Sequence, residues 1–411
     1  MPELASSTLP RHFGRYTLFD FIGKGGMAEI YLARTQTELG GSRLSVIKQI
    51  IPTIATNARF AEMFTFEAKL SAQLTHANIV QVFDLGRADD RLFIAMEYVE
   101  GFDLNDLLRR CSKQKTPLPL EFALHIATST LRGLDYAHRR EGDNGMPLGI
   151  VHRDVSPSNV LVSVEGEVKL CDFGIAHANE AVVDAAHSHD ELIKGKAGYM
   201  SPEHARGESI DARSDVFSAG VLLWELMAGR RMYRAQESGP SLLDLAREAN
   251  TLELPDRGLQ GHDAIKIVVQ KALERDPNDR YASAHEMLLA LESHMMSERI
   301  LANPLRFGEW LIEHFGSEII EQRRARERAV MALEHAGIVV EITPVGSVAD
   351  LEEDVPLSTS VSVPPLAQEN EVEENLAPSA MAVSPPGPSK GLWFAVALVL
   401  IVVLALAFGW R

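Results

Sequence analysis

Three side chains whose oxygen atoms can bind a metal ion or accept a proton lie close together in this sequence. Asp154 and Asn159 lie in the stretch HRDVSPSN at residues 152–159, and Asp172 opens the stretch DFG at 172–174. Carboxylate and amide oxygens are the ligands that a hard cation such as Mg²⁺ prefers. Lys48 ends the apolar run SVIK and adds a positive charge. Taken alone, such a lysine is usually just the solvated end of a strand.

A glycine cluster with the letters GKGGMA precedes Lys48, at residues 23–28. In a strand–turn–strand flap, backbone N–H groups can cover phosphates where glycine omits the side chain that would hold the backbone away. An ordinary glycine-rich hairpin turn explains the cluster equally well when it stands alone. Its interpretation therefore depends on the motifs farther along the chain.

The hydrophobic pattern indicates which elements position these residues. Alternating or short apolar runs predict strands at Tyr16 to Ile22, Ile30–Arg34, Leu44–Ile50 and Leu92–Val99. Ala58 to Leu74 has helical spacing. From Leu104 the pattern becomes helical, with strand-sized pieces around Val151, at Val160–Val162 and at Val168–Leu170. The sequence thus predicts an α+β chain in which a small β-rich lobe precedes a larger helical lobe.

Taken in order, these motifs resemble the eukaryotic-type protein kinase family, in its bacterial Ser/Thr branch, over about residues 16–298. Further stretches match: LTHANIV at 74–80, MEYVEG at 96–101, SPE at 201–203, DVFSAG at 215–220 and DPNDR at 276–280. The resemblance implies a bilobal kinase domain with an N-lobe at 16–98 and a C-lobe at 99–298, after a tail at 1–15. It also implies transfer of the ATP γ-phosphate to Ser or Thr hydroxyls of protein substrates, with Mg²⁺.

The resemblance also implies a role for each matching residue. Asp154 would accept the proton of the substrate hydroxyl, and Asn159 and Asp172 would hold Mg²⁺. Lys48 would grip the α- and β-phosphates while paired with Glu67. Beyond the site, Asp215 would brace the catalytic-loop backbone, and Glu203 would pair with Arg280.

The same resemblance implies a nucleotide-binding set in both lobes. The Glu97 carbonyl and the Val99 N–H would hydrogen-bond adenine, with Met96 behind it. Asp103 would reach the ribose hydroxyls. The residues expected to cover the phosphates are Ile22, Gly23, Lys24, Gly25, Gly26 and Ala28, and those expected to sandwich the adenine ring are Ile30, Val46 and Leu161.

Two positions depart from the family pattern. Most Ser/Thr kinases carry a lysine two residues after the catalytic aspartate, where this chain has Ser156, and a threonine where it has Lys196. In the family fold the two positions face each other near that aspartate. Because phosphoryl transfer relies on positioned positive charge, we expect a charge swap in which Lys196 supplies the missing ammonium. The alternative is a lost donor at Ser156 and a solvent-exposed Lys196.

Three other functions compete with an active Ser/Thr kinase. A pseudokinase would bind nucleotide and act as a scaffold, which Ser156 favours and the intact set of Lys48, Asp154, Asn159 and Asp172 opposes. A small-molecule phosphotransferase shares the Asp and Asn spacing but lacks the SPE and Asp215 region. Tyrosine specificity is disfavoured because VSPS at 155–158 does not resemble the A-A-R pattern of that branch.

The composition limits which classes of partner the protein could bind and which cellular compartment it fits. The formal net charge is −17, from 57 acidic and 40 basic residues among 411. This disfavours a nucleic-acid binder, since polyphosphate binding requires clustered Lys and Arg. Cys111 and Cys171 give no disulfide framework and fit a reducing compartment. The N-terminal stretch lacks an apolar core, so we expect no signal peptide.

Three segments follow the kinase-like region. Residues 299–340 predict a helical extension whose apolar face carries Trp310, Leu311 and Phe315, and whose charged face carries Arg323, Arg324, Arg326 and Arg328. It is expected to pack on the main domain, with a docking element as the alternative. Residues 341–391 are rich in Pro, Ser and Glu, which predicts a disordered linker.

The last segment, LWFAVALVLIVVLALAFGW at 392–410, carries no charge and no proline. As a helix it would span about 28 Å, close to a hydrocarbon core of about 30 Å. We therefore expect a single-pass tail anchor rather than a buried core helix, with the kinase domain in the cytosol. Activation through homodimerisation at the anchor stays open, as does phosphorylation of Ser188, a weak candidate beside Asp184 and Asp190.

Overall fold

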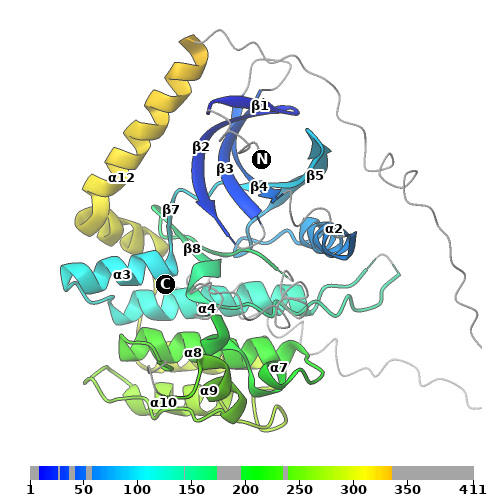
Figure 1. The fold of residues 1–411 in the computed structure, drawn as a ribbon. Helices are drawn as coiled ribbons and strands as arrows, with labels where there is room; N and C mark the ends of the chain where they lie inside the picture. Colours follow the sequence, from blue (N-terminus) through cyan, green and yellow to red (C-terminus); the bar gives the residue numbers. More distant parts are fainter. Residues whose placement is uncertain are drawn as a thin grey trace, which may run out of the picture. The chain divides into compact units, whose positions relative to one another are not determined.

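The computed structural model describes residues 9–25, 28–36, 42–51, 58–142, 144–173, 196–234 and 239–335. All of them belong to the first of two units into which the chain divides, Met1–Val355. Within this unit a small lobe built on a β-sheet adjoins a larger lobe built on helices (Figure 1). The structure therefore confirms the predicted α+β, bilobal architecture.

The small lobe is a six-stranded antiparallel sheet flanked by one helix. Its strand order is β1-β2-β3-β4-β6-β5, with bounds β1 Arg11–Phe13, β2 Tyr16–Lys24, β3 Ala28–Gln36, β4 Ser42–Ile50, β5 Val82–Ala88 and β6 Arg91–Glu97. Helix α2 (Ala58–Ala72) places Phe64 and Ala68 against buried Ile94 of the sheet. Lys48 pairs with Ile30 on one side and Ile94 on the other, so its position is fixed by two neighbouring strands.

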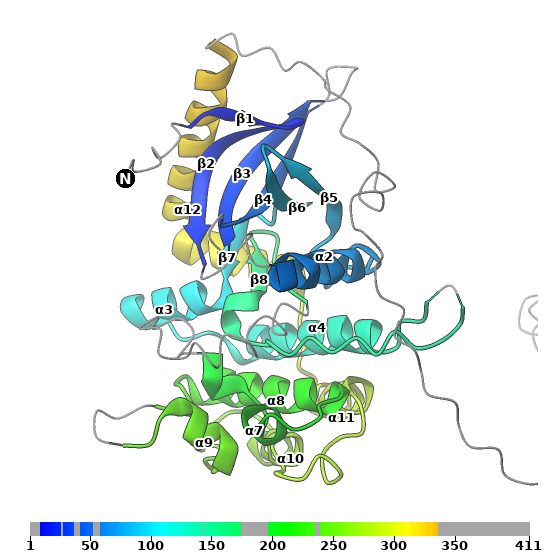
Figure 2. The ribbon, with the colours of Figure 1, turned by 45° about the vertical axis from the view of Figure 1, so that its right-hand side comes forward.

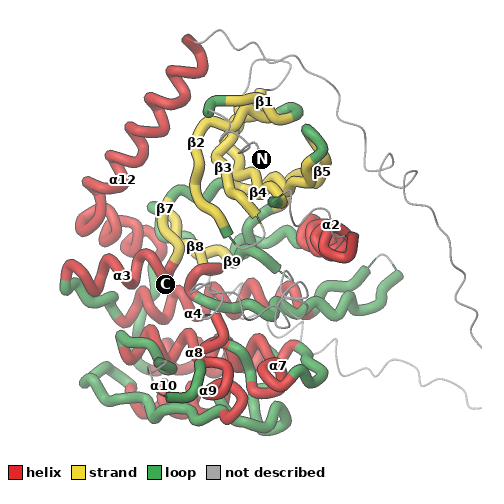
Figure 3. The backbone as a smooth tube through the Cα atoms, viewed as in Figure 1, coloured by secondary structure: helices red, strands yellow, loops and turns green. Residues whose placement is uncertain are grey.

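The large lobe holds the main hydrophobic core. Its helices are α3 Leu104–Gln114, α4 Leu120–His138, α7 Pro202–Arg206, α8 Ala212–Ala228, α9 Leu242–Glu248, α10 His262–Ala272 and α11 Ala284–Ser297. Nearly every residue of α8 is buried, which suits an apolar helix at the centre of a lobe. Figure 3 shows a small sheet of β7 (Gly101–Asp103), β8 (Val160–Ser163) and β9 (Val168–Leu170) where the lobes meet.

A long C-terminal helix, α12 (Pro304–His335), lies within the predicted helical extension. It begins against the large lobe and runs along the side of the small lobe, as two views show (Figures 1 and 2). At about 1.5 Å per residue its 32 residues extend about 48 Å. Leu311 and Phe315 of its predicted apolar face are fully buried.

The predicted strands and helix correspond to β2, β3, β4, β6, β8, β9 and α2. The strand expected around Val151 is wrong, because that stretch is loop. Its backbone N–H groups at His152 and Arg153 donate to the Asp215 carboxylate rather than to a neighbouring strand. In the described part of the chain, no helix is both long and apolar enough to span a bilayer. The linker at 341–391, the anchor at 392–410 and Ser188 lie outside the described residues.

Candidate active site

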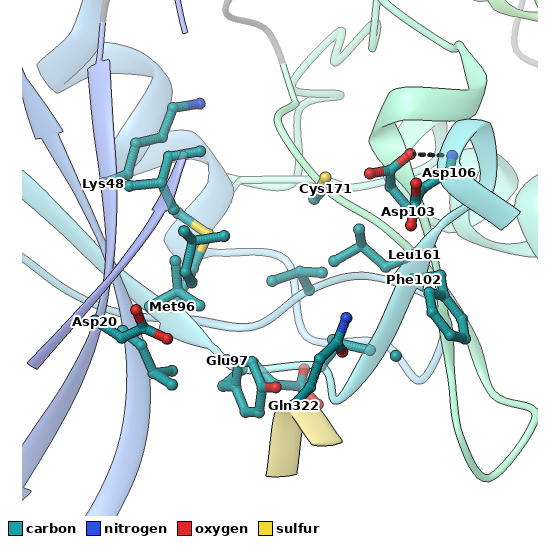
Figure 4. A pocket seen from close by; sticks show the side chains of 18 of the residues that line it. Asp20, Lys48, Met96, Glu97, Phe102, Asp103, Asp106, Leu161, Cys171 and Gln322 are labelled. Carbon is teal, nitrogen blue, oxygen red and sulfur yellow. Dashed lines mark hydrogen bonds between the residues drawn. The ribbon is translucent and has the colours of Figure 1, made fainter. Parts of the chain in front are cut away.

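A cavity of about 600 Å³ lies between the sheet of the small lobe and the β7–β8 region of the large lobe (Figure 4). Ten of the predicted site residues line it, from both lobes: Ile22, Ile30, Val46, Lys48, Met96, Glu97, Val99, Asp103, Leu161 and Asp172. Figure 4 shows Lys48 at one end of this cavity and Glu97 at the other. The cavity thus has a charged end and an end formed by the connection between the lobes.

At the charged end, the two lobes meet in an ion pair. The Nζ atom of Lys48 donates to Oδ1 of Asp172 over 2.6 Å. Although burial opposes ionisation of Asp172, the ammonium of Lys48, with smaller contributions from Lys196 and His152, outweighs that effect and lowers the pKa of the carboxyl below its ordinary value. Asp172 therefore stays negative, which is the state a cation ligand requires.

The loop that carries Asp154 is held in place by Asp215, which lies in the first turn of α8. Oδ2 of Asp215 accepts from the His152 N–H at 2.7 Å, and Oδ1 accepts from the Arg153 N–H at 2.8 Å. Nε2 of His138 lies 2.8 Å from Oδ2. Burial opposes ionisation of Asp215, but these bonds outweigh it and lower its pKa. The predicted bracing role of Asp215 is confirmed.

This bracing holds a backbone conformation that the sequence alone would not favour. Arg153 has φ of 66° and Asp172 has φ of 61°, in the left-handed region. Such residues cost roughly 1–3 kcal/mol each and persist where their surroundings fix them. The Cys171 N–H donates to the Asn159 carbonyl at 3.0 Å, which ties the two segments together.

Two side chains contact Asp154 directly. Nδ2 of Asn159 donates to the Asp154 carbonyl oxygen and to Oδ2, both at 2.8 Å. The ammonium of Lys196 donates to the same Oδ2. Burial alone would lower the pKa of Lys196, but the neighbouring carboxylate of Asp154 raises it above the ordinary lysine value. Lys196 is therefore an ammonium beside Asp154, as the charge-swap hypothesis requires of its position.

The donors present suit a magnesium ion. Asn159 uses its amide nitrogen on Asp154, which leaves its carbonyl oxygen as the ligand it can offer. Asp172 supplies a carboxylate. No cluster of three or more His, Cys, Asp or Glu forms a metal site among the described residues. Mg²⁺ fits such a sparse set, because it usually keeps several waters and takes only one or two protein carboxylates together with substrate phosphates.

A second buried ion pair supports the segment that follows Lys196. Arg280 donates to Glu203 through Nη1 at 2.7 Å and Nη2 at 2.8 Å, which confirms the predicted pair. Glu203 also accepts from the Ser214 hydroxyl at 3.1 Å. These contacts anchor the segment to α8 and so fix where Lys196 emerges.

The remaining predicted residues lie around the glycine turn and on α2. Gly23 and Lys24 end β2, Ala28 begins β3, and the Gly25 N–H donates to the Ala28 carbonyl at 2.8 Å across the turn. Gly26 lies outside the described residues. Glu67 is on α2, but its side chain is outside the described part of the structure, so the pair with Lys48 stays a prediction.

The sequence reasoning missed one contributor to this cavity. Gln322, Ala325 and Arg326 of α12 line it, together with Cys171 from the large lobe. Burial raises the pKa of the Cys171 thiol, which keeps it protonated and unreactive. The sequence contains only a weak indication of this role of α12. Arg323 and Arg326 are three residues apart and so share a helix face, but the sequence does not indicate which surface that face contacts.

Comparisons with known proteins agree with this geometry. The Protein kinase domain family matches residues 16–290. The chain is 36% identical over 313 residues to "Tyrosine-protein kinase MasK" of Myxococcus xanthus, covering 76% of this chain and 48% of the relative. It is 36% identical over 290 residues to "Serine/threonine-protein kinase PknB" of Mycobacterium leprae, covering 68% and 43%. The chain thus matches less than half the length of these relatives.

A solved structure gives the same fold. The PknI kinase domain of Mycobacterium tuberculosis superposes with a TM-score of 0.51 at 28% identity. The superposition covers 69% of this chain and 98% of that domain.

The pair between Lys48 and Asp172 predicts how the protein responds to acid. A carboxyl with a depressed pKa contributes stability above its unfolded pKa, and that contribution is lost as pH falls through the lower folded value. Lys48→Met removes the main cause of the depression and leaves burial, which raises the pKa, so the contribution of Asp172 no longer declines as the pH is lowered. We therefore expect the free energy of unfolding of Lys48→Met, measured with urea and without nucleotide, to be lower than that of wild type at neutral pH and to fall less steeply on acidification. The double variant Lys48→Met/Asp172→Asn, which has no carboxyl at this position, should regain part of the stability lost at neutral pH. The same dependence of the unfolding free energy on pH in wild type and Lys48→Met would contradict the assignment.

Proposed function

The chain belongs to the protein kinase family, and on this premise we propose that it is an active serine/threonine protein kinase. It would transfer the γ-phosphate of ATP to protein hydroxyls with Mg²⁺. The observation that carries the proposal is the convergence of Lys48 and Asp172 at one end of the interlobe cavity, with Asp154 and Asn159 joined to each other on the braced loop.

In the proposed reaction the oxygen of the acceptor hydroxyl forms a bond to the γ-phosphorus. The bond from that phosphorus to the β–γ bridging oxygen breaks, and ADP leaves with its electron pair. The hydroxyl proton passes to the Asp154 carboxylate. Lys48 holds the phosphate chain, and the bracing by Asp215 keeps Asp154 in line, which is where positional catalysis gains most of its rate. When bound, Mg²⁺ neutralises charge on the phosphate oxygens.

Lys196 would supply the cation that Ser156 cannot. Its ammonium already lies against Asp154, beside the place where the phosphoryl group would pass. Ser156 is buried, and its hydroxyl lies 3.1 Å from that of Ser158. The transition state needs positive charge near the transferred group, and an ammonium carried at position 156 or at position 196 would meet that need.

The choice of acceptor hydroxyl rests on the catalytic-loop sequence. MasK is named a tyrosine kinase and PknB a serine/threonine kinase, so relatives of both names match this chain. We favour serine and threonine because VSPS at 155–158 departs from the tyrosine-branch pattern. The pseudokinase scaffold remains the alternative, favoured by Ser156 alone.

Membrane attachment is a further part of the proposal. The uncharged apolar segment at 392–410 supports a single-pass tail anchor, with the catalytic domain in the cytosol where ATP is present. Homodimerisation through this anchor is left open.

Incubation of the purified full chain with Mg²⁺ and γ-labelled ATP tests the proposed activity. We expect label on the protein itself or on an added acceptor protein, with phosphoserine and phosphothreonine after hydrolysis and mapping. Asp172→Ala should abolish the label, because the metal ligand is lost. Nucleotide binding without transfer would instead identify a pseudokinase, and phosphotyrosine alone would place the chain in the tyrosine branch.

The charge swap makes its own prediction. Lys196→Met should lower the phosphorylation rate at least tenfold, since one electrostatic donor is worth roughly 10²–10³ in rate. The double variant Ser156→Lys/Lys196→Thr puts the ammonium back at the position usual in the family and should recover most of the loss. Nucleotide affinity, measured in parallel, should stay near the wild-type value in both. A Lys196→Met enzyme within twofold of wild type would rule out the swap.

A further inference from the structure

Helix α12 is packed against both lobes at once. Its first half inserts Phe307, Leu311 and Phe315 into the core of the large lobe, where all three are fully buried. Phe307 stacks on Phe122 with ring centroids 4.7 Å apart. The ion pair between Arg110 of α3 and Glu318 of α12 adds a polar contact at the end of this half. The first half is therefore part of the large lobe.

The second half of α12 reaches the small lobe. Ala329 and Val330 pack against Phe19 of β2 and Leu32 of β3, two buried residues of the sheet. A single continuous helix thus joins elements that, in a two-lobed fold, are otherwise connected mainly through the segment after β6. Lobe closure around a ligand pivots on a few such connecting residues, and α12 forms a second connection between the same two lobes.

Between these two halves, α12 contacts the connecting segment itself, residues 98–100, which joins β6 to β7. Glu100 in that segment accepts from Arg323 through Nη2 at 2.8 Å and Nε at 3.1 Å. It also accepts from Nη2 of Arg326 at 2.5 Å. The Arg326 guanidinium lies over the ring of Tyr98, 5.1 Å from its centroid. Two cations on one carboxylate, one of them stacked on a neighbouring ring, fix the position of this segment.

The same turn of α12 forms one side of the interlobe cavity. Gln322, Ala325 and Arg326 line it. Figure 4 shows Gln322 at the end of the cavity away from Lys48, near Glu97. A cavity of about 600 Å³ remains with the helix in place, within the range of about 300–1,000 Å³ typical of small-molecule sites. The helix is therefore a wall of the cavity and leaves room for a ligand.

We propose that α12 completes the nucleotide site. Gln322 contacts the nucleoside end of the bound nucleotide through its carboxamide, which offers both a donor and an acceptor. Arg323 and Arg326 are positioning residues that act through Glu100 and hold the connecting segment at the distance the base requires. The identity of the ligand rests on the proposed function. Because the coupling is reciprocal, bound nucleotide in turn holds α12 against the lobes.

Binding of a non-hydrolysable Mg·ATP analogue to the full chain, measured by titration calorimetry, tests this proposal. Gln322→Ala and Arg326→Ala should each raise Kd about tenfold, the scale expected for a lost hydrogen bond to a charged or closely held group. The matched control is Arg324→Ala, which removes the same charge from an exposed residue of the helix that does not line the cavity and should leave Kd unchanged. Melting temperatures without nucleotide show that each variant is folded.

A second measurement distinguishes direct contact between α12 and the nucleotide from purely structural support of the lobes by α12. Hydrogen exchange of the backbone amides at 319–335 should slow when the analogue binds wild type, and should respond less in Gln322→Ala. Values of Kd within twofold of wild type for both variants, an equal effect of Arg324→Ala, or tighter binding in the variants would overturn the proposal. A wild-type chain that binds no nucleotide would overturn the proposed function as well.

An independent observation concerns the protein substrate. A groove of about 720 Å³ lies between α3 and the end of α8. In a chain of net charge −17, the described residues that line it include six cations and one carboxylate, Glu225. The cations are Arg109, Lys115, Arg230, Arg231, Arg234 and Arg257; of these, Arg109 is also paired with Asp106, and Arg231 with Glu225. Glu225 is already occupied by the Tyr199 hydroxyl at 2.6 Å, the Met232 N–H at 2.9 Å and Arg231 at 3.1 Å.

This cationic groove continues toward the reacting centre. A smaller cavity of about 210 Å³ shares Asn105, Glu225 and Arg231 with it and is also lined by Ser156 and Lys196. Because Lys196 contacts Asp154, an acceptor hydroxyl at Asp154 would lie at the inner end of this path. A polypeptide leaving that point along the groove meets positive charge over several residues. We infer that the preferred substrates carry Asp or Glu beside the acceptor, an inference that rests on the proposed function.

Peptides that share one acceptor serine but differ in flanking charge test this inference. We expect kcat/KM of the full chain to be at least tenfold higher with flanking Asp and Glu than with flanking Lys, and to fall with added salt. Arg109→Ala/Arg234→Ala should remove most of the preference while leaving a neutral peptide unaffected. The control is Lys113→Ala, an exposed residue of α3 outside the groove. Equal rates for both peptides, or a preference for Lys, would overturn the inference and leave the proposed activity standing.

Discussion

The contact between Lys48 and Asp172 is the interaction around which the rest of the site is arranged. It joins the central strands of one lobe to the other lobe with an ammonium and a carboxylate 2.6 Å apart. Each partner is positioned by a separate device. Lys48 is fixed by pairing of β4 with strands on both sides. Asp172 follows β9 in a left-handed conformation and is linked through Cys171 to the Asn159 backbone. Neither device alone would bring the charges together.

The chemistry of phosphoryl transfer constrains where positive charge lies at the reacting centre, but not which residue carries that charge. An ammonium near the transferred phosphoryl group is required by electrostatics, whereas the backbone position that carries it is not. In this chain Lys196 places an ammonium against Asp154, and the Glu203–Arg280 pair anchors the segment from which it extends. A departure from the usual pattern at Ser156 can therefore be compatible with the same chemistry.

Much of the fold and of the candidate site was predictable from the amino-acid sequence, for identifiable reasons. Strands such as β4 and β6 have apolar runs bounded by turns, and the ordered motifs at Asp154, Asn159 and Asp172 match those of the protein kinase family. The loop around Val151 was mistaken for a strand because its apolar letters reflect burial, while its backbone bonds go to the distant Asp215. The role of α12 at the cavity was not predictable, since Gln322 and Arg326 carry no signal of the surface they meet. Glu100 likewise has no local pattern that identifies it as a partner of two arginines.

Helix α12 connects the two lobes independently of the segment that joins them. A two-lobed enzyme normally opens and closes about the segment that joins its lobes, whereas here that segment is held at Glu100 by a helix packed on both lobes. The account as a whole still depends on one claim, that Lys48, Asp154, Asn159 and Asp172 surround a single nucleotide and its Mg²⁺. The most direct measurement is titration of an ATP analogue into the full chain with and without Mg²⁺, for wild type and Asp172→Asn. The account predicts one site per chain that Mg²⁺ strengthens in wild type and not in Asp172→Asn. Binding that is indifferent to Mg²⁺ in wild type, or no binding, would contradict it.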